Sequence, residues 1–180
     1  MTYYGGKELA AAFRTVRGNT LKIAEDIPDN KYDFRASPDT RSVAQLLVHI
    51  ALVPSFAMHV HGNKIRDMKT VNFAELIQKI GAEEARPRNK AEIVAFLTSE
   101  RDKFASFLEG LSESFLAEIV TMAPGNEPVA RSRLELLLAS KEHEMHHRGQ
   151  LMLIERMIGI VPHLTRDRER QRMAQAQASN

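Results

Sequence analysis

The segment KEHEMHHRGQ, residues 141–150, concentrates three histidines among charged and polar neighbours. It lies in a leucine-rich stretch from Val129 to Ile160 whose apolar residues recur at steps of three and four, so we predict one long helix there. At about 100° per residue, His143 and His147 fall on the same inward face, one turn apart. Two imidazoles in that arrangement can bind one metal ion.

Histidines on an inward face have a second interpretation, as neutral side chains hydrogen-bonded inside a helical bundle. A single histidine would favour that structural interpretation. For a pair spaced i, i+4 the cost of burial doubles and metal coordination offsets it, so the spacing favours a metal site. His146 lies off the shared face and is expected in solvent. A metal site then needs a third ligand from another part of the chain.

The composition is that of one soluble domain with a full core. The chain has 180 residues, of which 43% are hydrophobic and 27% charged. We predict a single domain over residues 1–165 and a polar tail over residues 166–180 that is frayed or disordered. The net charge of +2 is spread along the chain, which argues against nucleic acid or a membrane surface as the partner.

The chain contains no cysteine, which excludes disulfides, thiolate-ligated zinc, iron–sulfur clusters and a cysteine nucleophile. No long uninterrupted apolar run suggests a signal peptide or a membrane span. The expected location is therefore the cytoplasm.

Four long helical patterns predict an all-α four-helix bundle. The first runs from Gly6 to Ile27. The second begins after Ser42, which has the spacing of a capping box with Gln45. The third begins with Asn89 as its cap and Glu92 three residues on, and runs to about Leu108. The fourth is the histidine-bearing helix. A long connection, residues 62–89, joins the second helix to the third and includes a short helical pattern over residues 72–80. No segment alternates as a strand would.

His49 is the third-ligand candidate, because it is the titratable residue centred on the inward stripe of the second helix. His59 and His61 fall off that stripe and are expected on the surface or in a loop. Two inward positions on different helices of a bundle can meet at mid-height, so His49 can join the pair on the fourth helix. Three histidine ligands leave at least one metal position open, as in catalytic sites.

Two further polar residues are weaker candidates for a catalytic role. Glu100 is the one acid on the apolar stripe of the third helix, where it either lines a pocket or lies at a hydrated contact between helices. Gln150 lies one turn beyond His147 on the same face and could hold a ligand or a substrate oxygen. Neither identifies a catalytic residue.

The same segment also matches the H-E-x-x-H pattern of zinc hydrolases, with Glu144 as general base. The glycine and third histidine that continue the metzincin pattern are not at their positions, and no strand is predicted for an active-site sheet. We therefore treat a zinc hydrolase of this kind as a minor alternative.

Two segments resemble the DinB superfamily: YDFRASPDTRSVAQLLVHIA, residues 32–51, and HEMHHRGQLMLIERMIG, residues 143–159. The resemblance implies a four-helix bundle, often dimeric, with a divalent metal on three histidines, which by position are His49, His143 and His147. Members of that family include bacillithiol-dependent thiol transferases and a mycothiol-dependent isomerase.

The resemblance implies a metal-dependent enzyme of the thiol-transferase type, in which an open metal position activates a thiol or water for a small-molecule substrate. Without cysteine in the chain, the thiol would be a low-molecular-weight cosubstrate. Zn or Ni is favoured, and Fe or Cu also suits three imidazoles. A non-catalytic metal-binding or stress-response protein is the alternative. A polar pocket beside the metal would favour the enzyme, whereas a site closed off by Phe56 and Phe104 would favour the non-catalytic protein.

A second apolar stripe on the fourth helix predicts a homodimer. The stripe lies opposite the metal face, where a helix of a monomeric bundle should be polar. The alternative is that another part of the same chain covers this stripe. Its members are Leu134, Leu138, Met145 and Met152.

Overall fold

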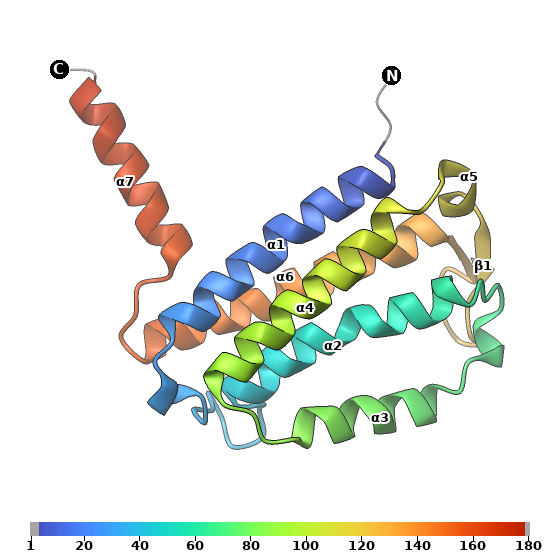
Figure 1. Cartoon of the computed structure of the whole chain (residues 1–180), viewed down its shortest axis with the longest axis horizontal. Helices are drawn as coiled ribbons and strands as arrows, with labels where there is room; N and C mark the ends of the chain where they lie inside the picture. Colours follow the sequence, from blue (N-terminus) through green and yellow to red (C-terminus); the bar gives the residue numbers. More distant parts are fainter. Residues whose placement is uncertain (1–3, 179–180) are drawn as a thin grey trace.

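Four long helices form the body of the protein, as the computed structural model shows (Figure 1). The structure describes residues 4–178. The four helices are α1 (Gly6–Asp26), α2 (Val43–Gly62), α4 (Lys90–Glu109) and α6 (Arg133–Met157). The predicted all-α four-helix bundle is thereby confirmed.

Capping boxes set where three of these helices begin. Ser42 and Gln45 form the one that opens α2, and Asn89 with Glu92 forms the one that opens α4, both as predicted. The helix α6 begins later than predicted, at Arg133 and not at Val129. Ser132 caps it, accepting a hydrogen bond from the backbone of Glu135.

The late start of α6 has a second cause, a small β-ladder that the sequence did not predict. Strand β1 (Ile119–Thr121) pairs antiparallel with β2 (Ala130–Ser132). Three-residue strands are too short to show a period-two pattern, so the prediction of no strand was wrong here. The short helix α5 (Glu113–Leu116) precedes β1 and follows the end of α4.

The long connection between α2 and α4 carries a helix of its own, α3 (Phe73–Ala85), after a 3₁₀ turn, η2 (Met68–Thr70). Another 3₁₀ turn, η1 (Asp29–Lys31), follows α1. Helix α3 lies alongside α2 outside the four-helix body (Figure 1). Its partly buried Ile80 packs against the main core cluster, which fixes the C-terminal end of α3 next to α2.

A fully buried arginine ties the four long helices together. Arg17 on α1 donates through Nε to Glu144 on α6 (2.8 Å), through Nη1 to the carbonyl of Leu97 on α4 (3.0 Å), and through Nη2 to the carbonyl of Ile50 on α2 (2.9 Å). Ile50 precedes Pro54 by one turn, and proline has no N–H for that carbonyl. The guanidinium therefore satisfies a group that the helix leaves unpaired.

Residues after the bundle form a helix, α7 (His163–Ala178), where the sequence predicted a frayed or disordered tail. Its first turn is anchored: His163 is buried with Nε2 3.2 Å from Asn19 Oδ1, and Arg166 pairs with Asp26 at 2.6 Å. Beyond that turn α7 projects away from the bundle with its side chains exposed (Figure 1). Residues 1–3 of the predicted domain and 179–180 of the predicted tail lie outside the described residues.

Helix α2 is the most apolar of the bundle, with a mean hydropathy of 1.7 over 18 residues, enough in length and composition to cross a membrane. In this fold it packs between α4 and α6 as a core helix. Its hydropathy is thus explained by burial within the bundle.

The predicted second stripe of α6 is largely covered by the same chain. Leu134 and Leu138 pack against one core cluster and Met152 against another. Met145 is 44% exposed. Leu153 and Met157, on the same helix, are more exposed than Met145. The apolar surface that α6 offers to a second chain is therefore smaller than the sequence pattern suggested.

Candidate metal centre

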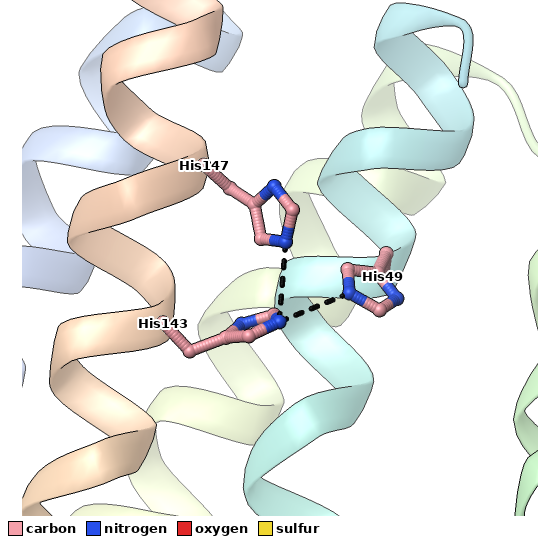
Figure 2. Close-up of side chains that lie close together, drawn as sticks. All are labelled: His49, His143 and His147. Carbon is pink, nitrogen blue, oxygen red and sulfur yellow. Dashed lines mark hydrogen bonds between the residues drawn. The ribbon is translucent and has the colours of Figure 1, made fainter. Parts of the chain in front are cut away.

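The three predicted ligands come together at mid-height of the bundle. His49 lies on α2, and His143 and His147 lie one turn apart on α6 (Figure 2). Nε2 of His143 is 3.2 Å from Nε2 of His49 and 3.1 Å from Nε2 of His147. One ligand nitrogen from each histidine lies within 4.8 Å of the other two, so the group could hold a metal ion.

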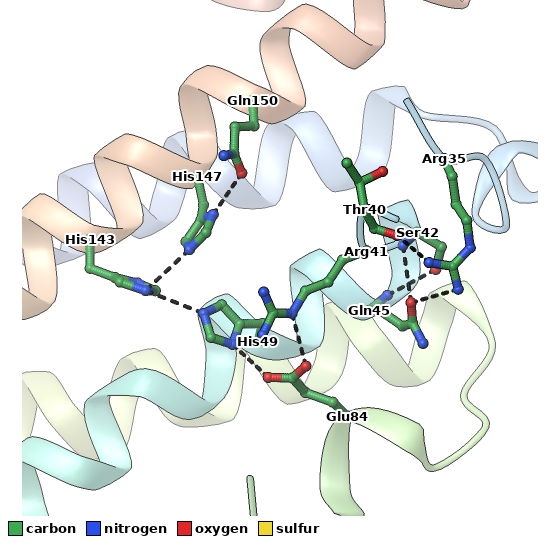
Figure 3. Close-up of polar contacts among 10 residues, drawn as sticks. All are labelled: Arg35, Thr40, Arg41, Ser42, Gln45, His49, Glu84, His143, His147 and Gln150. Atoms are coloured by element: carbon green, nitrogen blue, oxygen red, sulfur yellow. Dashed lines mark hydrogen bonds and ion pairs between the residues drawn. The ribbon is translucent and has the colours of Figure 1, made fainter. Parts of the chain in front are cut away.

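The outward nitrogens of two of these rings have partners that determine where their protons lie. Nδ1 of His49 is 2.5 Å from a carboxylate oxygen of Glu84, and Nδ1 of His147 is 2.7 Å from the amide oxygen of Gln150 (Figure 3). Both partners are acceptors, so each ring donates through Nδ1 and keeps a lone pair on Nε2. A carboxylate behind a histidine is the usual support of a metal ligand.

These tautomers make the cluster fit a cation. Two lone pairs face the third ring, His143, which can donate a proton to only one of them, so without a cation at least one nitrogen lacks a donor. Burial lowers the pKa of His143 to about 4, helped by the neighbouring rings of His147 and His49, and burial also lowers the pKa of His147. Neutral imidazoles are the form that binds metal, and three of them suit Zn, Ni, Fe or Cu.

Two cavities flank the three histidines. One of about 510 Å³, called here the apolar cavity, lies between α2, α6 and the loops at their ends and reaches His143. Its walls are mostly aliphatic and aromatic, with Val53, Phe56 and Leu136 among them. The other, of about 590 Å³ and called here the polar cavity, reaches His147. Its polar walls include Arg35, Thr40, Arg41, Gln45 and Gln150.

The site is therefore not sealed by the two phenylalanines that the sequence singled out. Phe56 lines the apolar cavity, whereas Phe104 lies in the core with its ring 4.8 Å from that of Phe13. A polar cavity beside the histidines is the feature that favours an enzyme over a closed metal-binding protein.

The weaker catalytic candidates have different positions. Gln150 lines the polar cavity and holds His147, so it supports a ring of the cluster. Glu100 is buried on α4, accepts a hydrogen bond from Lys103 at 2.6 Å and lines neither cavity. A role for Glu100 at this site has no support in the geometry.

Glu144 points away from the histidines. Its side chain is 2% exposed, and Oε1 accepts hydrogen bonds from Arg17 and, at 2.7 Å, from the hydroxyl of Thr20 on α1. The sequence placed Glu144 on the flank of its helix, and the structure buries that flank. The general-base position of an H-E-x-x-H enzyme is thus not filled by Glu144.

Several residues near the site were missed by sequence reasoning. Glu84 comes from α3, an exposed helix whose pattern shows no reason to approach His49. Arg41 donates to the second oxygen of Glu84 at 2.9 Å, so this carboxylate joins an arginine and a ring of the cluster (Figure 3). His61, predicted on the surface or in a loop, is buried and lines the apolar cavity, whereas His59 is exposed as predicted.

Comparison with known proteins agrees with this architecture. Residues 12–151 match the model of the DinB superfamily. The chain belongs to the DinB superfamily. Among its DinB relatives is YjoA of Bacillus subtilis (strain 168), which is 25% identical over 154 residues, covering 84% of this chain and 90% of YjoA.

Several solved structures share the fold. The crystal structure of YjoA, a DinB-like protein of Bacillus subtilis, superposes with a TM-score of 0.62 at 20% identity over 84% of this chain and 92% of YjoA. YfiT of Bacillus subtilis, described as a probable metal-dependent hydrolase with an unusual four-helix bundle topology, has a TM-score of 0.67 at 12% identity, covering 89% and 91%. The mycothiol-dependent maleylpyruvate isomerase has a TM-score of 0.63 at 14% identity, covering 84% of this chain and 63% of the isomerase.

Proposed function

We propose that this DinB protein is a metal-dependent enzyme of the thiol-transferase type. His49, His143 and His147 hold one divalent metal ion, with Zn or Ni favoured. The ion, when bound, lowers the pKa of a thiol or water that takes an open position. The acceptor is a small electrophilic molecule. The chain has no cysteine, so the thiol is a low-molecular-weight cosubstrate.

The observation that carries this proposal is the orientation of the three rings. Glu84 and Gln150 hold His49 and His147 with their Nε2 lone pairs directed at the same place, which is reached by a cavity on either side. A structural metal site is enclosed by its protein ligands, whereas a catalytic one leaves access for a reactant. The relatives YfiT and the mycothiol-dependent isomerase support metal and thiol chemistry in this fold.

The residues of the two cavities suggest a division of roles. The polar cavity next to His147 is lined by two arginines, Arg35 and Arg41, and one acid, Asp39, and this excess of positive charge suits a carboxylate group of a polar thiol. The apolar cavity next to His143 suits a largely hydrocarbon electrophile. Bound on opposite sides of the histidines, the two reactants would be held close together, which lowers the entropic cost of their encounter.

The test combines metal analysis with a screen for turnover. Freshly purified protein should contain close to one equivalent of divalent metal, and replacement of His143 and His147 by alanine should remove it. His59→Ala, an exposed histidine on α2 that lies outside the cluster, is the control. Low-molecular-weight thiols are then screened against electrophiles, with activity expected only in the metal-loaded protein. Protein that loads metal but turns over no thiol and hydrolyses no electrophile would instead be the non-catalytic metal-binding protein.

Two further expectations remain proposals. A homodimer through α6 is proposed on the second apolar stripe of that helix, of which Met145 is 44% exposed. A cytoplasmic location is the setting in which a small-thiol cosubstrate would be available.

A further inference from the structure

Two polar contacts between α2 and α6 enclose the apolar cavity at its two ends. His49 meets His143 at one end, and His61 meets Arg133 at the other, with His61 Nδ1 3.2 Å from Nη1 of Arg133. His61 follows His49 by 12 residues, roughly 18 Å along a helix. Both His61 and His143 line the cavity, so it is an elongated space with a histidine toward each end.

The contact with Arg133 determines the tautomer of His61. A guanidinium can only donate hydrogen bonds, so Nδ1 of His61 is the acceptor and the ring proton is on Nε2. Burial and the positive charge of Arg133 lower the pKa of His61 to about 4, which keeps the ring neutral at physiological pH. The ring therefore has one N–H, on the nitrogen that Arg133 does not contact.

Arg133 is held in place by its own contacts and can therefore fix the tautomer of His61. It is fully buried, its Nε donates to Glu118 at 3.0 Å, and its guanidinium lies 4.5 Å from the centre of the Phe115 ring. Its backbone N–H also donates to the carbonyl of Glu118 at 2.9 Å. The imidazole of His61 is thus oriented by a fixed neighbour, and only 3% of the residue is exposed.

Few other groups in this cavity can donate a hydrogen bond. The amide of Asn126 donates to the carbonyl of Ala123 at 2.9 Å, within its own loop. Ser140 and His143 lie on α6, with His143 at the three-histidine end. A polar atom buried among apolar walls without a partner is costly, so a hydrogen bond from the His61 N–H would stabilise an oxygen at the far end of a ligand.

We propose that Nε2–H of His61 binds a carbonyl oxygen of the substrate at the end of the apolar cavity remote from the three histidines. This inference rests on the proposed function, because it assigns the apolar cavity to the electrophile. It names the substrate class as an elongated, mainly hydrocarbon molecule with a carbonyl acceptor distant from its reacting end. His61 is a specificity-determining residue in this scheme, with Arg133 positioning it.

The test compares two probes of the same shape, the ketone 4-acetylbiphenyl and its alkene isostere 4-isopropenylbiphenyl. Binding of each to the zinc-supplied full-length protein is measured by NMR titration. One neutral hydrogen bond should make the ketone bind about fivefold more tightly than the alkene. His61→Leu should remove that preference, and His61→Gln, which keeps an N–H donor, should retain part of it. His59→Leu, on the same helix and exposed, should leave the preference unchanged.

An equal ketone preference in wild type and His61→Leu would overturn the proposal, as would binding of neither probe. If His61→Leu does not fold, the wild type labelled with ¹⁵N in its histidines serves instead. The resonance of His61 Nε2 should then shift on binding of the ketone and not on binding of the alkene. A lack of that difference overturns the proposal. No turnover is needed for this comparison, so its failure is separate from a failure of the proposed function, which would appear as missing metal or missing metal-dependent activity.

Discussion

Arg17 donates a hydrogen bond to the carbonyl of Ile50, the group that Pro54 leaves unpaired in α2. The same guanidinium pairs with Glu144 on α6 and with the backbone of α4. Two helices that carry the histidine cluster, α2 and α6, are therefore connected through one buried arginine on α1. The register of these helices relative to each other decides whether the three rings meet.

Replacing Arg17 by Met should destabilise the protein strongly. Without the guanidinium, the buried carboxylate of Glu144 keeps only the hydroxyl of Thr20 and the carbonyl of Ile50 loses its partner. Breaking a buried ion pair typically costs about 3–5 kcal/mol. The free energy of unfolding from urea denaturation measures this. Arg14→Met is the matched control: Arg14 lies on the same helix in an exposed pair with Glu109, and its loss should change little. Equal effects of the two substitutions would contradict the role given to Arg17.

Replacing Glu144 by Gln should lower stability and leave metal content unchanged. The substitution removes the charge that pairs with Arg17 but touches no histidine of the cluster. In an H-E-x-x-H hydrolase the same change would abolish activity while the fold and the metal were retained. Thermal unfolding and metal analysis of one preparation separate the two outcomes. A fully stable, metal-loaded and inactive Glu144→Gln protein would restore the hydrolase interpretation.

Replacing Glu84 by Gln should weaken metal binding by about 10- to 100-fold, the usual effect of removing a carboxylate behind a histidine ligand. Glu84 accepts from Nδ1 of His49 and so holds both the tautomer and the orientation of that ring. Competition with a chromogenic chelator gives the affinity. Glu75→Gln, on the same helix but paired with Lys79 at the surface, should bind metal as the wild type does. Unchanged affinity in Glu84→Gln would show that the contact does not support the metal site.

Glu155 should make a destabilising contribution to the folded state that grows as the pH rises from about 4.5 to 7. Burial raises the pKa of this carboxyl to about 7, with the charge of Asp26 adding to the effect, and both its oxygens are enclosed without a partner. The unfolded carboxyl titrates near 4.5, so above that pH the unfolded state releases a proton that the folded state keeps, which favours unfolding. Glu155→Gln should therefore stabilise the protein at pH 8, by up to about 3 kcal/mol, and have little effect at pH 4.

Urea denaturation at the two pH values measures the difference. A stabilisation by Glu155→Gln that is the same at pH 4 and pH 8 would contradict a raised pKa. Glu25→Gln, near the end of α1 and exposed, serves as the control that should show no such dependence.

The proposed homodimer predicts a mass of two chains by light scattering at micromolar concentration. Met145→Glu should reduce that mass to one chain, because it places a charge on the exposed part of the second apolar stripe of α6. Lys141→Glu, a charge change on the same helix, is the comparison. A mass of one chain in the wild type, unchanged by Met145→Glu, would rule the dimer out.

The sequence alone was sufficient to predict the parts of the site that one helix sets by itself. The i, i+4 spacing of His143 and His147 places both rings on one face wherever that helix packs, because helical geometry is determined by residues three and four apart. The capping boxes of α2 and α4 are equally local, and they were predicted at the correct residues. The four amphipathic patterns then predicted the bundle.

What only the tertiary structure decided depends on contacts between residues far apart in the chain. Glu84 reaches His49 because Ile80 packs against the core and fixes that end of α3 beside α2, which no pattern within α3 reveals. His61 lies off the inward stripe of α2, yet the start of α6 brings Arg133 against it and buries it. Side-chain periodicity reports which face of a helix is apolar. Which neighbour covers the remaining faces is decided by the packing of the whole chain.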